Sequence, residues 1–212
     1  MPFTVATVGT AITAAEKVDK GLGLISKYLD KFKSHPDVAA QKLAQALEEI
    51  AKTYQVVDTA FSAYLSLGID DGALEKNSKP LLAIEGGALN IDVERGRGHC
   101  TAIKQIHDKY LNKWFVRVFQ SAQGEYDQVQ SVFYALAYAD EDLFEYFVTV
   151  VKALQEEATA ALDLVVAGKT QEARQRILSS RPALGPLRRI ISQTMQQLYR
   201  LKGEFLQIAQ VA

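Results

Sequence analysis

The 212-residue sequence has little of what marks disulfide-bonded, β-rich or strongly charged proteins. Its single cysteine, Cys100, excludes a disulfide within the chain and favours a reducing compartment, so a cytoplasmic location is the default expectation. Its 13 glycines and 5 prolines are too few for the many turns of an all-β fold. Lys plus Arg is 24 and Asp plus Glu is 25, and the resulting net charge of -1 argues against nucleic acid as a partner.

The sequence also lacks a long hydrophobic run. The longest uncharged stretch near the start covers residues 1–15, and four threonines dilute it. A membrane-spanning helix needs about 20 apolar residues, so this segment is too short to cross a bilayer. No lysine or arginine precedes it, so it does not resemble a secretory signal. We therefore expect a soluble protein whose first segment reaches a membrane surface at most.

Apolar residues recur at steps of three and four over most of the chain, which is the spacing of amphipathic helices. No long stretch alternates with period two, so strands are not expected. The pattern predicts an all-α fold, an elongated antiparallel bundle of four to five long helices with a short extra helix, forming one domain over residues 1–212. Helices are expected over residues 4–33, 36–67, 88–119, 125–167, 170–179 and 186–210.

Helix breakers set the expected boundaries. Gly168 is a good terminator for the helix before it. Pro182 and Pro186 predict an interruption between a short helix and the final long one. An acidic triplet after Ala139 looks like a fresh first turn, so a kink or break is expected there. Two glycines weaken the start of the third long helix, for which His99 is the alternative first residue.

Residue spacings argue against catalysis and against a metal or cofactor. A di-metal bundle needs Glu-x-x-His on two helices, and no histidine here has a glutamate three residues before it. Cys100 and His107 lie seven residues apart, or about 10 Å along a helix, too far for a nucleophile and its base. Both follow the apolar seam of Ile103, Tyr110 and Trp114, so we expect a buried structural pair. No phosphate-loop or nucleophile-elbow motif occurs.

Charge is distributed unevenly along the second half of the chain. Residues 125–167 have a net charge of -8, whereas residues 168–212 have a net charge of +6. One interpretation is that the arginines of the C-terminal segment form a surface for an anionic partner or an anionic membrane. This candidate surface consists of Arg174, Arg176, Arg181, Arg188, Arg189 and Arg200.

The other interpretation is that the acidic and the basic helix pair with each other inside the bundle. Consecutive helices are usually neighbours, so we favour this pairing. If the two helices turn back at Gly168, Glu156 and Glu157 lie opposite Arg181. The two prolines blur the register, so Arg188 and Arg189 are alternative partners.

Aromatic residues are concentrated between Trp114 and Phe147, in larger number than one seam can bury. A helix that is apolar on all sides is either central in its bundle or part of an interface. For the helix that carries these residues, we expect central packing. The residues concerned are Trp114, Phe115, Phe119, Phe133, Tyr134, Tyr138, Phe144, Tyr146 and Phe147.

Two functions fit these observations. The primary expectation is a non-enzymatic helical interaction module that binds a protein partner or self-associates. The alternative is a membrane-acting helical effector or regulatory domain whose apolar first helix leaves the bundle and enters lipid. The same helix, which contains Ala and Thr, also suits a buried place in the bundle. The candidate membrane-contacting segment contains Phe3, Val5, Val8 and Ile12.

Overall fold

The computed structural model describes residues 5–66, 101–102, 104–120, 123–128 and 140–212. Every regular element within these residues is a helix, which confirms the all-α expectation. The long helices are α1 (Val5–Lys27), α3 (Ala39–Ser66), α9 (Asp140–Val166) and α10 (Thr170–Gln210). The short ones are α2 (Leu29–Ser34), the π-helix η1 (His107–Leu111) and α7 (Asn112–Val118).

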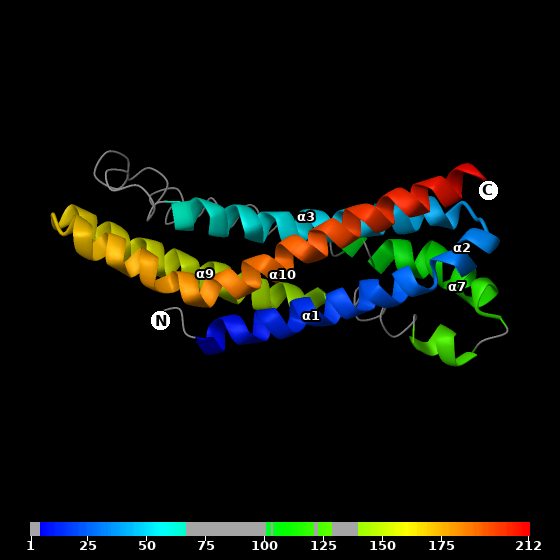
Figure 1. Ribbon diagram of the computed structural model, residues 1–212, viewed down its shortest axis with the longest axis horizontal. Helices are drawn as coiled ribbons and strands as arrows, with labels where there is room; N and C mark the ends of the chain where they lie inside the picture. Colours follow the sequence, from blue (N-terminus) through cyan, green and yellow to red (C-terminus); the bar gives the residue numbers. More distant parts are fainter. Residues whose placement is uncertain (1–4, 67–100, 103, 121–122, 129–139) are drawn as a thin grey trace.

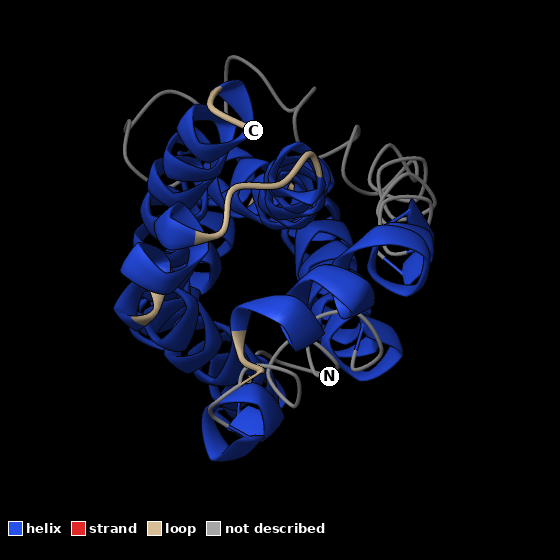
Figure 2. Ribbon diagram, turned by 90° about the vertical axis from the view of Figure 1, so that its right-hand side faces the viewer, coloured by secondary structure: helices blue, strands red, loops and turns tan. Residues whose placement is uncertain are grey.

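The long helices lie along one axis and form an elongated bundle (Figure 1). α1 and α10 run in one direction along this axis, whereas α3 and α9 run in the other. The view along the axis in Figure 2 shows the helices arranged around a common centre. α10 crosses the bundle diagonally and packs against α1, α3 and α9. It is therefore the helix that joins the other long helices into one core.

The side chains of α10 explain this central place. Residues at steps of three and four are buried along the whole length of the helix, as an amphipathic helix requires. The second half of this stripe follows the steps of three and four expected for the last helix. The buried residues are Ala173, Ile177, Ser180, Leu184, Leu187, Ile191, Thr194, Leu198, Leu201, Phe205 and Ile208.

The predicted interruption at Pro182 and Pro186 is wrong, because α10 is one continuous helix of 41 residues. A proline inside a helix removes a backbone hydrogen bond and costs about 3 kcal/mol. Both prolines are exposed, so the carbonyls that lose a donor lie toward solvent. Ser180, Leu184 and Leu187 are buried on the opposite side. Their packing against the bundle holds the helix together through both prolines.

Three other boundaries depend on local backbone geometry. The single helix expected over residues 4–33 is divided at Tyr28 into α1 and α2. Asp37 lies two residues before α3 and stabilises its start, because its Oδ1 accepts a hydrogen bond of 2.8 Å from the backbone N–H of Ala39. Gly168 has a φ of 74° and separates α9 from α10, as expected of a helix terminator. α9 starts at Asp140, while the expected break near Ala139 lies just outside the described residues.

The π-helix η1 corrects the expected seam of the third long helix. His107 is fully buried, as predicted, whereas Cys100 and residues 88–99 lie outside the described part of the chain. Tyr110, predicted to be on the seam, is 37% exposed, and Leu111 is buried in its place. A π-helix contains about one more residue per turn than an α-helix, so the buried position after His107 moves along by one residue.

An aromatic cluster closes the end of the bundle where α2, α7 and the last turns of α10 meet. The ring of Phe32 lies 5.0 Å from that of Trp114 and 5.3 Å from that of Phe205, measured between centroids. Phe115 and Phe119 each lie 5.7 Å from the Phe32 ring. Trp114, Phe115 and Phe119 are thus buried inside the bundle, at its end, and are not exposed as an interface. The aromatic side chains between residues 133 and 147 lie outside the described part.

Candidate interaction surface

The first helix is packed into the bundle. Val8 and Ala11 are buried, and Ile12 is half-buried against the core. Phe3 and the side chain of Val5 lie outside the described part of the chain. α1 contacts both α9 and α10. The described part of the candidate membrane segment therefore occupies the place of an ordinary bundle helix.

No helix in the described part of the chain has the length and apolar character needed to cross a bilayer.

Arg176, Arg188 and Arg200 contact other helices of the bundle. Arg176 pairs with Glu157 of α9, and Arg188 pairs with Asp58 of α3 at 3.3 Å. The Nη2 of Arg200 donates a hydrogen bond of 3.0 Å to the Ser26 hydroxyl of α1. Arg181 and Arg189 are exposed, and Arg174 is half-buried. The structure thus distributes these cations among several helix contacts and does not gather all six on one face.

The contact between α9 and α10 contains the acid–base pairing favoured from the sequence, with a different basic partner. Glu157 is 5% exposed, and Arg176 donates to both of its carboxylate oxygens, at 2.7 Å and 3.0 Å. The expected partners were Arg181, Arg188 and Arg189. Because α10 is not interrupted, its register from Gly168 is regular and places Arg176 opposite Glu157.

Tyr64 of α3 lies close enough to Glu157 and Arg176 for both charges to affect its pKa. Burial, and then the negative charge of Glu157, raise the pKa of Tyr64 to about 12. Ser180 and Arg176 act in the opposite direction and are outweighed. The phenol is therefore held in its neutral form next to a paired carboxylate.

This shift predicts a loss of stability at alkaline pH. An unfolded tyrosine ionises near pH 10, whereas folded Tyr64 keeps its proton up to about 12. The unfolded state therefore binds fewer protons above pH 10, and the free energy of unfolding falls as pH rises toward 12. Tyr64→Phe should remove about 1 kcal/mol of the loss seen between pH 9 and pH 11 in urea unfolding. Parallel pH profiles for the two proteins would contradict this assignment.

The second half of α10 has three charged residues, and each contacts a different helix. Arg200 contacts α1 through Ser26, as described above. Lys202 pairs with Glu48 of α3 at 2.9 Å, and Glu204 pairs with Lys33 of α2 at 3.0 Å. The hydrogen bond from Lys202 is the main cause that lowers the pKa of Glu48. The charged side chains of residues 190–212 thus each contact a neighbouring helix.

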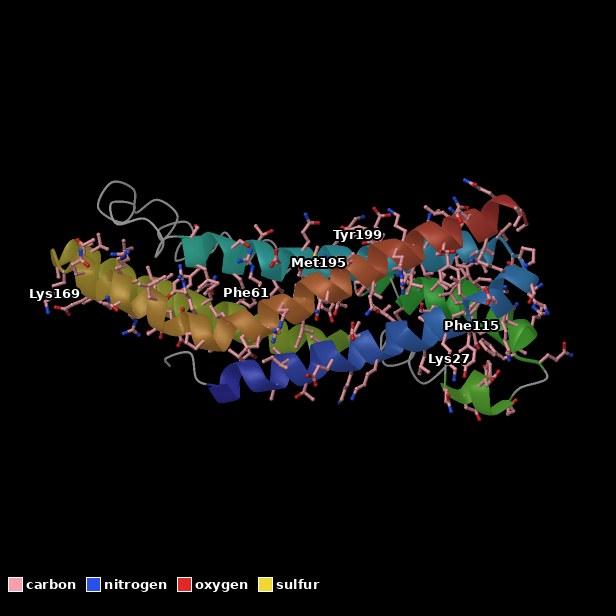
Figure 3. All side chains as sticks on the ribbon, viewed as in Figure 1. Lys27, Phe61, Phe115, Lys169, Met195 and Tyr199 are labelled. Atoms are coloured by element: carbon pink, nitrogen blue, oxygen red, sulfur yellow. The ribbon has the colours of Figure 1, made fainter. Side chains whose placement is uncertain are left out.

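An uncharged exposed stripe remains on the outer side of this half of α10. Tyr199 is 45% exposed and Leu206 is 37% exposed. Met195 lies half-buried about one turn before Tyr199 (Figure 3). Gly203 has open space where a Cβ would be. The residues of this uncharged α10 face follow alternating steps of four and three, which places them on one side of the helix. They are Ser192, Gln196, Tyr199, Gly203, Leu206 and Gln210.

This face was not predicted from the sequence. The sequence does contain a signal for it. Next to the buried positions of this helix, a second set of positions at helical spacing has no charged residue. What the sequence does not show is where Arg200, Lys202 and Glu204 point. Only their contacts with α1, α3 and α2 show that the stripe is uncharged at the surface as well.

The described residues contain no group of three or more His, Cys, Asp or Glu side chains that could hold a metal ion. Comparison of the chain with protein-family models, curated proteins and solved structures finds no match.

Proposed function

We propose that this protein is a non-enzymatic helical interaction module that binds a protein partner, or a second copy of itself, through the uncharged α10 face. One observation supports this proposal most directly. The charged side chains of residues 190–212 contact three other helices, and Tyr199 and Leu206 remain exposed on an uncharged surface.

The face shares two features with the centre of a protein interface. Interface centres are depleted in charge and enriched in tyrosine, and this face is uncharged and exposes Tyr199. A partner that covers Tyr199 and Leu206 buries apolar surface, which stabilises the complex by about 25 cal/mol per Å². No charged group of this face has to leave water. The ion pairs Lys202–Glu48 and Lys33–Glu204 lie next to the face and suit a polar rim.

Replacing both exposed anchors with charged residues tests the proposal. Tyr199→Lys/Leu206→Lys should weaken self-association in sedimentation velocity, or partner capture in a quantitative pull-down, by at least about tenfold, since it places two charges at an interface centre. Val166→Lys is the matched control, because Val166 is 81% exposed beside the turn between α9 and α10. Equal association of the variant and the control would contradict the proposal.

A vesicle assay distinguishes the membrane-acting alternative. The packing of Val8 and Ala11 against the bundle supports a first helix that stays in place. We therefore expect the full chain to cause no leakage of vesicles that contain an anionic lipid. Leakage that is lost on Phe3→Glu would favour the membrane effector over the interaction module.

A further inference from the structure

A second surface, separate from the uncharged α10 face, gathers cations around one exposed aromatic ring. η1 and α7 carry Lys109, Lys113 and Arg117 at steps of four residues, and all three are exposed. Residues 101–118 have a net charge of +3, although the first 124 residues together have a net charge of only +1. The net charge of the longer segment hides this local excess of positive charge. We define the Tyr110 surface as Lys42, Lys109, Tyr110, Lys113 and Arg117.

Tyr110 is the centre of this surface. The Nζ of Lys109 and the Nζ of Lys42, which comes from α3, each lie 5.3 Å from the centroid of the Tyr110 ring. Lys42 also donates a hydrogen bond of 3.1 Å to the side chain of Gln45. A cation at this distance is attracted to the face of the ring. Two helices thus place ammonium groups around one exposed phenol.

The π-helix is what brings Tyr110 to the surface, because His107 and Leu111 take the buried positions on either side of it. The helix is also fixed in place. Trp114 Nε1 donates a hydrogen bond of 3.0 Å to the carbonyl oxygen of His35, and Arg117 pairs with Asp37 at the start of α3. π-helical turns occur frequently at functional sites. These contacts hold the backbone that carries Tyr110 in place before any partner binds, which lowers the entropy lost on binding.

We infer that the Tyr110 surface binds an acidic segment of a partner protein. The step of four residues from Lys109 to Lys113 spaces these two cations by about 6 Å along the axis, which matches carboxylates four residues apart on a facing helix. Arg117 extends the row, although its guanidinium is already paired with Asp37. Tyr110 supplies the aromatic anchor typical of protein interfaces. The short row of cations and the overall charge of -1 fit a peptide better than a nucleic acid, whose binding needs a broad basic surface.

A charged probe peptide tests this inference. The probe is a fluorescent, alanine-rich helical peptide of about 20 residues with glutamate at every fourth position, and glutamine replaces glutamate in its control. We expect the intact chain to bind the glutamate peptide and not the glutamine peptide in fluorescence anisotropy. Lys109→Glu/Lys113→Glu should weaken binding at least about tenfold, and added salt should weaken binding to the intact chain.

Two further proteins make the test specific. Arg181→Glu/Arg189→Glu makes the same change of charge at exposed positions of α10 and should bind the peptide nearly as well as the intact chain. Tyr199→Lys/Leu206→Lys should also keep peptide binding, since the two surfaces are separate. Failure of the glutamate peptide to bind, or equal loss in the α10 arginine variant, would overturn the inference. Tighter binding of a single-stranded DNA 20-mer through the same lysines would overturn it in favour of nucleic acid.

Discussion

Phe32→Ala should lower the free energy of unfolding by about 3–5 kcal/mol, the loss expected when a large buried aromatic side chain is removed. Phe32 is fully buried, and its ring contacts those of Trp114 and Phe205. The cavity would open where α2, α7 and α10 meet, so no single helix can move to fill it. Few substitutions in the described part of the chain remove as many ring contacts.

Urea unfolding followed by circular dichroism measures this loss. Tyr199→Ala is the control, because Tyr199 is 45% exposed and its loss should change stability by no more than about 0.5 kcal/mol. A loss below about 1 kcal/mol for Phe32→Ala would contradict the packing described for this end of the bundle. The same curves test the expectation of a single domain, which predicts one cooperative transition in each protein.

Arg176→Met should be the second large effect, at about 2–3 kcal/mol. Removing one partner of a fully buried ion pair costs about 3–5 kcal/mol, because the other charge stays buried without its partner. The Glu157 side chain is 6% exposed, whereas that of Arg176 is 38% exposed, so solvent screens part of the effect. The retained Glu157 carboxylate would then face Tyr64 without the guanidinium that now binds both of its oxygens.

A double variant separates this effect from simple loss of packing. Glu157→Leu/Arg176→Met removes both charges and should be more stable than Arg176→Met alone, even though it changes more residues. Arg188→Met removes an exposed pair with Asp58 and should cost only about 0.2–1 kcal/mol. A double variant less stable than Arg176→Met would show that the buried carboxylate is not the source of the loss.

Periodicity predicted the seams of the bundle, because burial of one helix face is a property of the sequence itself. In the helix expected over residues 186–210, the positions at helical spacing from Leu187 to Ile208 are buried. The interruption of the helix that was predicted at Pro182 and Pro186 was wrong. A local rule gives the cost of a proline, whereas the packing of Leu184 and Leu187 that offsets this cost depends on helices far away in the sequence.

The candidate surfaces were harder to predict, for two physical reasons. Tyr110 is exposed because one π-helical turn shifts the register, and α-helical spacing cannot show such a turn. The pairing of an acidic with a basic helix was predicted, but its register depended on whether α10 is continuous, so Arg176 was not the expected partner of Glu157. A count of charges along the chain does not show which side chains turn inward.

Site-specific photocrosslinking tests whether a partner docks on the uncharged α10 face. A photoreactive phenylalanine analogue placed at Tyr199 lies on the uncharged α10 face, and the same analogue placed at Val166 lies on an exposed position beside the turn between α9 and α10. In cells that naturally make the protein, we predict a crosslinked product of defined mass from position 199 and none from position 166. No product from position 199, or the same product from both positions, would contradict a docking role for this face.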